Sequence, residues 1–500
     1  MKKIQKSLCD LLPDIVPDNI DCMITGISND SRRVKSGDLF IATVGDRYDA
    51  RQDISTVINK AAAVFYEDDE TFQFNQSSVV PVIAVSHLNH KQGEIAARFY
   101  DDPSKAMRCV GVTGTNGKTT CTQWIAQALT LLKTKCATIG TLGSGLFSEE
   151  HLERTDWVNT GYTTPDPILL QEELMRLRDA NAVALAMEVS SHALAQERVN
   201  GMQFDVAVFT QLSRDHLDYH GDMPSYAAAK AKLFEMPNLR HAVINIDDAL
   251  GRRLAEATSQ RCDVLTYSLA GKEEADIRVD DVQETQQGFK VMLTTHVGSA
   301  QFDTKVLGHF NISNLLTVLG VLLVFDVALP DALRTIELLT PVDGRMQLVD
   351  DKVVPIVVVD YSHTPDALEK ALSVLRERSA GQLWCVFGCG GDRDRGKRSN
   401  MAKVAETYSD RIVVTNDNPR TESPDRIVDD IMTGFLAPNK VKIILDRADA
   451  ITYAIQTADK NDVVLIAGKG HENYQIIGNE TLAFNDVKIA RQILLQEQGN

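Results

Sequence analysis

The chain has 500 residues, 44% hydrophobic and 24% charged, a composition typical of a globular protein with enough apolar residues for several cores. Its 52 Lys and Arg against 69 Asp and Glu give a formal net charge of −17, so no large positive field exists to attract a nucleic-acid backbone. Neither a secretory signal core nor a membrane span is found, because the longest apolar stretch covers only 315–325. Together with eight cysteines that lack paired spacing, this predicts a cytoplasmic protein with no nucleic-acid partner and no membrane span.

The first hundred residues alternate short β-type runs with helical patterns. The segment Asp101-Asp102-Pro103-Ser104 disfavours a helix before the proline and is typical of a linker. We therefore predict a small N-terminal α/β domain at 1–102. Its predicted elements are strands at 38–44, 62–66 and 79–85 and a helix at 90–100.

From Met107 the pattern becomes strand, glycine turn and helix, and it recurs. This rhythm is typical of a mostly parallel sheet with flanking helices, and it predicts a central domain at 103–340. After Thr340-Pro341 it restarts, which predicts a C-terminal Rossmann-like α/β domain at 341–500. The strands expected in these two domains are 182–187, 204–210 and 241–245, then 356–360, 383–387, 412–415 and 463–467.

A phosphate-binding loop is predicted between the short apolar strand 109–112 and an amphipathic helix that runs through Leu132. The loop itself is Thr113-Gly114-Thr115-Asn116-Gly117-Lys118-Thr119-Thr120. Its two glycines let backbone N–H groups turn toward phosphates, the helix N-terminus adds partial positive charge, and Lys118 adds a point charge. Val112 stands where the usual pattern has a glycine. The alternative is a glycine turn before a helix.

Carboxylates and histidines follow two strands of the central domain. Glu188 ends the first strand and precedes Ser190 and His192, although alone it could be a solvated loop acid. The second strand leads into 211–220, where two acids and two histidines suggest Mg²⁺ ligation or phosphate contacts. Lys230, taken alone, is typical of an exposed helix lysine. Cys385 and Cys389 fit a buried pair better than half of a zinc site.

Six motifs in the correct order, within a match that runs from Ser31 to Gly470, resemble the Mur ligase family. These cytoplasmic ATP-dependent enzymes build the stem peptide of peptidoglycan. Four further motifs resemble the family members that add the third residue, namely Thr163-Thr164-Pro165, Gly388 to Arg398, Asp417-Asn418-Pro419-Arg420 and Gly468-Lys469-Gly470-His471-Glu472. The six family motifs are 113–120, 188–192, 215–220, 308–314, 344–346 and 360–365.

The resemblance implies that the γ-phosphate of ATP passes to a substrate carboxylate and that an amine then displaces phosphate from the acyl phosphate. It implies one or two Mg²⁺ ions near Thr119, Glu188, His216 and a carbamylated Lys230. Catalytic roles are implied for Lys118, Glu188, His216 and Lys230. The residues implied to bind ATP are Gly114, Thr115, Asn116, Gly117, Lys118, Thr119, Thr120, Asn314, Arg345 and Asp360; Arg345 could otherwise be a linker cation.

The resemblance also implies the other substrates, UDP-N-acetylmuramoyl-L-alanyl-D-glutamate and meso-diaminopimelate. Arg420 would pair with the distal carboxylate of diaminopimelate, which lysine lacks, unless Asn416 to Pro419 is simply a turn. The other residues implied for that amino acid are Arg393, Asp417, Asn418, Pro419, Gly468 and Glu472. Those implied for the nucleotide sugar peptide are Asn29, Ser31, Asp46, Arg47 and Tyr48 in the first domain, and Thr163, Thr164, Ser190, Gln196 and Arg198 in the second.

Three alternatives stay open at this point: a lysine-adding ligase, another amide ligase such as a folyl-glutamate ligase, and a nucleotide sensor or P-loop ATPase without amino-acid dependence. The expected fold is α/β with three domains, and the expected state is a monomer.

Overall fold

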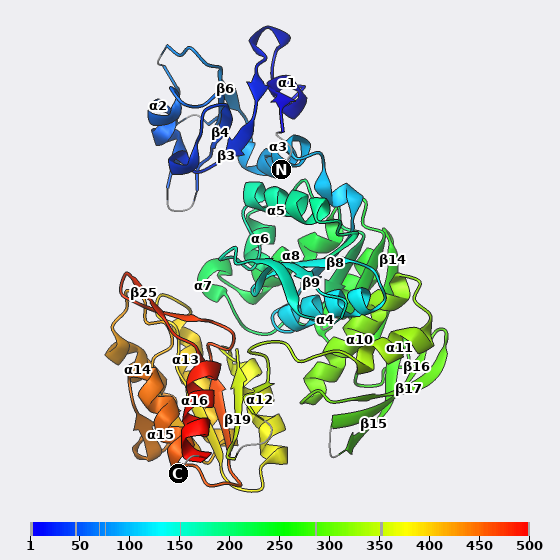
Figure 1. Ribbon diagram of the computed structural model, residues 1–500, viewed down its shortest axis with the longest axis vertical. Helices are drawn as coiled ribbons and strands as arrows, with labels where there is room; N and C mark the ends of the chain where they lie inside the picture. Colours follow the sequence, from blue (N-terminus) through cyan, green and yellow to red (C-terminus); the bar gives the residue numbers. More distant parts are fainter. Residues whose placement is uncertain are drawn as a thin grey trace.

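The computed structural model shows three α/β bodies that follow one another along the chain (Figure 1). The body with the N-terminus lies at one end, the body with the C-terminus at the other, and the central body lies between them. The structure describes residues 4–45, 48–69, 71–75, 77–150, 152–285, 288–350 and 354–498. Within these residues, no helix is both long enough and apolar enough to cross a bilayer.

The N-terminal body is built on the parallel sheet β3-β4-β5-β6. Alternate residues of its strands face opposite sides, and the side carrying Leu39 and Phe65 packs against α3 and also against Ile168 and Met175 of α5. The predicted elements are therefore present, with ends that differ by up to three residues. The bounds are β1 Lys6–Ser7, α1 Leu8–Leu11, β2 Met23–Ile24, β3 Gly26–Ser28, β4 Asp38–Ala42, α2 Ile54–Val57, β5 Ala63–Glu67, β6 Val82–Val85 and α3 Leu88–Phe99.

The N-terminal body touches the central body backbone to backbone. A Cβ atom added at Gly93 of α3 would lie 1.7 Å from the carbonyl oxygen of Asn200, so only glycine fits there. Gly201 approaches from the other side, where an added Cβ would lie 2.3 Å from the carbonyl oxygen of Gly93. A hydrogen bond between the side chains of His90 and Glu197 flanks this contact.

In the described part of the chain, the central sheet has eleven strands in the order β10-β9-β8-β11-β7-β12-β13-β14-β15-β16-β17. Its middle, from β8 to β14, is parallel, as predicted, and is covered on one face by α4 and α10 and on the other by α5 and α9. Burial on both faces explains the continuous apolar strands. Antiparallel strands that the sequence analysis did not predict extend the sheet at both ends.

The expectation of an amphipathic helix after the phosphate loop was wrong for α4. Nearly all of its residues are buried, because α4 lies between the sheet and α10. The bounds in this body are β7 Arg108–Thr113, α4 Lys118–Leu131, β8 Cys136–Gly140, β9 Gly143–Phe147, β10 Arg154–Val158, α5 Pro167–Asp179, β11 Ala184–Glu188, α6 Ser191–Ala195, β12 Val206–Phe209, α7 Leu217–His220, α8 Met223–Ala231, β13 His241–Asn245, α9 Ala249–Thr258, β14 Asp263–Ser268, β15 Ile277–Thr285, β16 Gly288–Thr295, β17 Gly298–Thr304, α10 His309–Val324 and α11 Leu329–Glu337.

The C-terminal body has a six-stranded sheet in the described residues, in the order β18-β19-β23-β20-β21-β22. All but β18 are parallel, with α12, α13 and α14 on one face and α15 and α16 on the other. Cys385 and Cys389 are buried free thiols. The bounds are β18 Gln347–Leu348, β19 Ile356–Asp360, α12 Pro365–Arg378, β20 Leu383–Phe387, α13 Arg398–Tyr408, β21 Arg411–Val414, α14 Pro424–Met432, β22 Val441–Ile443, α15 Arg447–Thr457, β23 Val463–Ala467, β24 Tyr474–Ile477, β25 Glu480–Ala483 and α16 Asp486–Gln498.

Candidate functional site

A cavity of about 1010 Å³ lies where loops from the central and C-terminal sheets face each other. Loops at the carboxyl ends of β7, β11 and β12 line it on one side, and loops after β19, β20, β21 and β23 line it on the other. The carboxyl ends of parallel strands are where open α/β sheets bind ligands. The predicted site residues that line it are Thr115, Asn116, Gly117, Lys118, Thr119, Thr120, Thr163, Thr164, Glu188, Ser190, Arg198, His216, Lys230, Asn314, Arg345, Asp360, Arg393, Asp417, Asn418, Arg420, Gly468 and Glu472.

Three predicted residues, Gly114, Gln196 and Pro419, adjoin this lining without forming part of it. The first-domain residues lie apart from it. Ser31 and Tyr48 come together because both hydroxyls donate to the carboxylate of Asp53, at 2.6 and 2.7 Å. Asn29 instead donates to Asp166 of the central body at 3.2 Å. The predicted residues Asp46 and Arg47 lie outside the described residues.

The phosphate loop has a backbone conformation that requires glycine at two positions. Gly114 and Gly117 have φ angles of +148° and +87°, and a Cβ on Gly114 would lie 1.9 Å from Thr210 Oγ1. The Lys118 Nζ donates to the carbonyls of Gly114 and Thr115 at 2.9 and 2.8 Å, and burial lowers the pKa of this amine. The loop therefore offers backbone N–H groups and one lysine at the N-terminus of α4, which is chemistry suited to phosphates.

Glu188 ends β11 with its side chain only 1% exposed. One of its oxygens accepts from the Thr141 amide at 2.8 Å, and the other accepts from the hydroxyl of Thr119 at 3.0 Å. Arg345 from the C-terminal body donates to that same hydroxyl at 2.9 Å. The pair of Glu188 and Thr119 thus joins the phosphate loop, the end of a strand and the C-terminal body.

These donors fit Mg²⁺ in the presence of phosphates. Carboxylate and hydroxyl oxygens are the hard ligands that this ion takes, and it commonly binds through one or two carboxylates while phosphates and waters complete its shell. Among the described residues, no three His, Cys, Asp or Glu side chains are grouped so as to hold a metal ion by themselves. Glu188 and Thr119 therefore suit an ion that arrives with a nucleotide.

Lys230 is buried, so the interpretation of this residue as an exposed helix lysine was wrong. Its side chain is 1% exposed; Nζ donates to the carbonyl of Gly114 at 2.7 Å and lies 4.4 Å from the ring centroid of Tyr226. Burial, and then the nearby charge of Lys118, hold the pKa of Lys230 well below its usual value. A neutral amine is therefore accessible beside the phosphate loop.

Asp215 is the centre of a charged cluster that joins the two bodies. His216 Nε2 lies 3.5 Å from its carboxylate, and from the C-terminal body His363 Nε2 and Lys397 Nζ lie 3.7 and 3.9 Å away. Burial tends to raise the pKa of Asp215, but His363 and Lys397 of the C-terminal body hold it below its usual value. Burial lowers the pKa of His216 to about 2, although Asp215 opposes the shift. The His216 ring is thus neutral and able to act as a ligand.

Asp360 and Asn314 occupy the part of the cavity between α10 and the end of β19. The Asp360 carboxylate accepts from the amide of Met346 at 2.6 Å and from the Ser362 hydroxyl, and burial raises its pKa. Asn314 carries an uncharged amide. Its Nδ2 donates to Asn311 at 3.0 Å, and its Oδ1 would lie 2.6 Å from a Cβ on Gly117. Both side chains therefore lie within the same cavity as the phosphate loop.

Arg198 and three hydroxyl residues line the cavity next to Glu188. Arg198 donates to the carbonyl of Thr164 at 3.0 Å and to Gln196 Oε1 at 2.9 Å. The hydroxyl of Thr164 donates to the Glu188 carbonyl at 2.9 Å and accepts from the amide of Ser190 at 3.1 Å, while Thr163 pairs with Thr141. These contacts fix a row of polar groups between the phosphate loop and the N-terminal body.

The far end of the cavity is formed by the loops after β21 and β23. Arg420 donates to the carbonyl of Gly391 at 2.8 Å, and among the described residues it forms no ion pair. Asp417, which is only 8% exposed, likewise forms no ion pair there, although the buried Arg447 cation interacts with it electrostatically. Asn418 and Glu472 are held by Lys469, whose Nζ lies 3.0 Å from Asn418 Oδ1 and 2.6 Å from Glu472 Oε2.

Sequence reasoning missed three residues here. Asp366, at the start of α12, accepts from Asn116 of the phosphate loop at 2.8 Å. Lys397 and Lys469 are buried against Asp215 and Glu472. Both lysines lie inside motifs that the sequence analysis noted, and a lysine among glycines after an apolar strand was the available signal.

The fold and the site define a multidomain α/β enzyme with a phosphate loop. Comparison with family models places residues 112–322 in the Mur ligase middle domain and residues 344–470 in the Mur ligase, glutamate ligase domain. A Coxiella burnetii protein named UDP-N-acetylmuramoyl-L-alanyl-D-glutamate–2,6-diaminopimelate ligase is 52% identical over 480 residues, which cover 95% of this chain and 96% of that protein. The chain belongs to the Mur ligase family.

Two solved structures extend this result. A structure described as UDP-N-acetylmuramoyl-L-alanyl-D-glutamate–2,6-diaminopimelate ligase superposes with a TM-score of 0.68 at 34% identity, covering 99% of this chain and 100% of that one. MurF ligase from Thermotoga maritima, solved in complex with ADP, has a TM-score of 0.63 at 17% identity, covering 95% of this chain and 97% of that one. The first structure is similar to this chain in both sequence and fold. The second is similar in its three-domain fold alone.

Proposed function

We propose that this chain is an ATP-dependent ligase that joins meso-diaminopimelate to UDP-N-acetylmuramoyl-L-alanyl-D-glutamate in the synthesis of peptidoglycan precursors. The observation that carries the proposal is one cavity lined at one end by the phosphate loop and at the other by Arg420, Asp417 and Glu472. A ligase of this kind must hold ATP, a carboxylate and an amine together. The names of the relatives support this choice of substrates.

In this proposal, Lys118 and the loop amides bind the phosphates, Asn314 contacts the adenine and Asp360 binds the ribose. Arg345, which lies 4.2 Å from the ring centroid of Tyr361, would stabilise the transferring phosphoryl group. The substrate carboxylate attacks the γ-phosphorus, the bond to ADP breaks, and an acyl phosphate results. The amine of diaminopimelate then attacks the acyl carbon, phosphate leaves, and the amine loses a proton.

Glu188, Thr119 and His216 would hold Mg²⁺ together with the nucleotide phosphates. The ion supplies neutralisation of the charge that builds on the phosphoryl oxygens. Lys230 would become a carbamate when its neutral amine attacks carbon dioxide, forming an N–C bond and releasing a proton. Its lowered pKa supports this step, because only an uncharged amine is a nucleophile.

The proposal assigns amino-acid selection to the loops after β21 and β23. The Arg420 guanidinium would pair with the distal carboxylate of diaminopimelate, with Arg393 nearby, and Asp417 would accept from the distal ammonium. One Glu472 oxygen is already engaged by Lys469, so Glu472 would contribute only its other oxygen. Asn418, Pro419 and Gly468 would shape the pocket.

The muramoyl dipeptide would lie along Thr163, Thr164, Ser190 and Arg198, with Gln196 orienting the arginine. Its uridine end would extend toward Asn29, Ser31 and Tyr48 in the N-terminal body. We further propose domains at 1–102, 103–340 and 341–500, a monomeric state and a cytoplasmic location. The abrupt change of sheet at each boundary supports the division.

The test is phosphate release by the purified protein with ATP, Mg²⁺, the UDP-MurNAc-dipeptide and meso-diaminopimelate, with each component omitted in turn. We expect release only with all of them, and a lower kcat/KM for lysine by a factor of about 10⁴, because lysine leaves Arg420 unpaired. Equal rates with lysine would reject the substrate but keep the ligase. ATP turnover without any amino acid would instead indicate a P-loop ATPase.

A further inference from the structure

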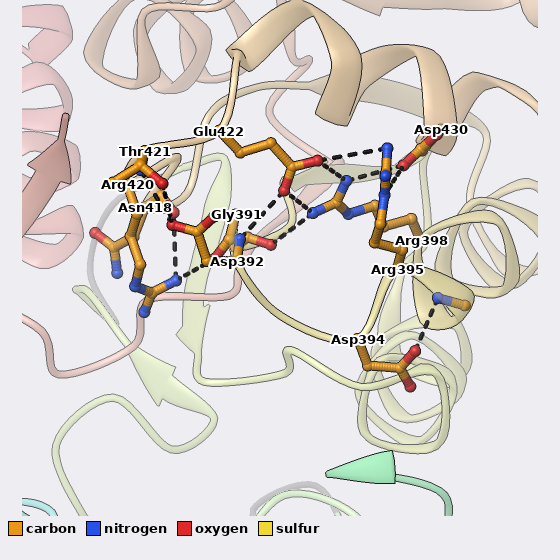
Figure 2. A network of polar contacts seen from close by, with 12 residues as sticks. Gly391, Asp392, Asp394, Arg395, Arg398, Asn418, Arg420, Thr421, Glu422 and Asp430 are labelled. Carbon is orange, nitrogen blue, oxygen red and sulfur yellow. Dashed lines mark hydrogen bonds and ion pairs between the residues drawn. The ribbon is translucent and has the colours of Figure 1, made fainter. Parts of the chain in front are cut away.

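We propose that the ion pair between the buried Arg398 and the partly buried Glu422 positions Arg420. This would make Arg398 and Glu422 determinants of amino-acid selectivity. Neither residue lines the cavity. The inference rests on the proposed function, because it concerns how the residue assigned to the distal carboxylate is held. Figure 2 shows the polar network that joins them.

The two loops that carry this network are in backbone contact. The amide of Gly391, after β20, donates to the carbonyl of Asn418, after β21, at 3.0 Å. A Cβ on Gly391 would lie 1.9 Å from the carbonyl oxygen of Pro419, and a Cβ on Gly390 would lie 3.0 Å from Arg420 Nη1. No side chain fits between the loops at Gly391, so a shift of one loop moves the other.

Arg398, which does not line the cavity, binds both loops. Its side chain is 1% exposed, and its two terminal nitrogens donate to the two oxygens of Glu422 at 2.8 and 2.7 Å, which is a bidentate pair. The same guanidinium also donates to Asp430 at 2.9 Å and to the carbonyl of Gly390 at 3.2 Å. Glu422 in turn accepts from the amide of Asp392 at 3.1 Å. The buried Arg398 therefore connects the two loops: it binds Gly390 in the loop after β20 and Glu422, two residues after Arg420, in the loop after β21.

Arg420 has a conformation that its neighbours must maintain. Its φ angle is +53°, in the left-handed region that a residue with a side chain rarely adopts. The adjoining Thr421 is tied to the other loop, because its amide and hydroxyl donate to Asp392 Oδ2 at 3.1 and 2.9 Å. The amide of Arg420 itself donates to the carbonyl of Ile476 at 3.1 Å, and its carbonyl accepts from the amide of Gly478 at 2.7 Å. The backbone of Arg420 is therefore held by the 476–478 segment and, through Thr421, by the loop that Glu422 and Arg398 tie together.

The side chain of Arg420 is fixed along one edge only. Nη1 donates to the carbonyls of Gly391 and Asn418 at 2.8 and 3.4 Å, whereas Nε and Nη2 donate to nothing among the described residues. A guanidinium held in this way presents a preorganised edge to a carboxylate in the cavity. Loss of the Arg398–Glu422 pair would release the loop that sets the direction of this edge.

The test compares Glu422→Gln with Glu406→Gln, a matched control. The Glu406 carboxylate accepts two backbone amides of the same body, at 2.8 Å each, and has no contact with the Arg420 loop. We expect Glu422→Gln to raise the KM for diaminopimelate by about tenfold to a hundredfold, the range expected for a lost hydrogen bond to a charged group. The KM for ATP should stay within about twofold, and the preference over lysine should fall. The control should leave all three quantities unchanged.

A double-mutant cycle separates positioning from general damage. In an Arg420→Ala background, Glu422→Gln should add less than about twofold to the KM for diaminopimelate. An unchanged KM in the single variant, or the same rise in both backgrounds, would overturn the inference. Should Glu422→Gln fail to fold, Glu422→Asp, which keeps the charge, carries the same cycle and should give a smaller rise. Wild-type protein without diaminopimelate-dependent phosphate release would instead reject the proposed function, and this inference with it.

Discussion

A buried ion pair behind the far end of the cavity yields a quantitative prediction. Arg447 of α15 and Asp486 of α16 are both fully buried and joined by two hydrogen bonds of 2.8 Å. The same guanidinium donates to the carbonyls of Asn416 and Ala467, at 3.3 and 3.0 Å, directly before two cavity residues. Asp486→Ala leaves this buried cation without its carboxylate partner and with only the two carbonyl hydrogen bonds. Breaking such a pair costs about 3–5 kcal/mol of folding free energy.

The opening of the C-terminal body alone can be followed by hydrogen exchange of the β20 and β23 amides, measured by mass spectrometry. Global unfolding does not isolate this event, because the chain has three bodies. We expect the amides of these strands to exchange about a hundredfold to several thousandfold faster in Asp486→Ala. Asp486→Leu combined with Arg447→Met should recover part of the loss, because replacing both charges removes the unpaired cation. Acceleration below about threefold in Asp486→Ala, or no recovery in the double variant, would refute the reasoning.

Three further predictions concern the site. Lys230→Ala should abolish ligase activity while the unfolding midpoint changes little, and a short-chain carboxylate should restore part of the activity; near-normal activity would exclude a catalytic carbamate. Arg420→Ala should raise the KM for diaminopimelate by about a hundredfold or more with the KM for ATP unchanged, and equal losses for both would indicate general damage. Arg398 lowers the pKa of Glu422 to about 2, so its stabilising effect is complete above pH 4.5 and lost as the pH falls toward 2. The difference between wild type and Glu422→Gln in the hydrogen-exchange protection of the β20 and β23 amides, corrected for the intrinsic pH dependence of exchange, should therefore shrink across that window, and a constant difference would contradict the assignment.

The sequence predicted an element well where the burial of that element determines which residue types it can contain. Strands 241–245, 356–360, 383–387 and 463–467 lie where they were predicted, because a parallel strand buried on both faces must be a continuous apolar run. The hairpins formed by β15, β16 and β17 were missed. Much of β15 and β17 is exposed and polar, so neither strand forms such a run.

For the site, the sequence indicated which loops meet but not how their side chains pair. Asn116 and Asp366 bond across 250 positions of the chain, and Arg398 and Glu422 across 24. No spacing rule connects such residues, because their proximity is created by the packing of sheets and helices. The burial of Lys230 was unpredictable for the same reason, since it depends on a loop 116 residues away.

The tight seam between α3 and residues 200–201 has a mechanical consequence. Arg198, just before this seam, lines the cavity, and α3 also packs on α5 of the central body. A rotation of the N-terminal body would therefore displace the part of the cavity lining that contains Arg198. If the N-terminal body binds the nucleotide end of the substrate as proposed, that binding would be transmitted through this contact to the cavity wall, and Gly93→Ala, whose Cβ would lie 1.7 Å from the carbonyl oxygen of Asn200, would weaken the coupling.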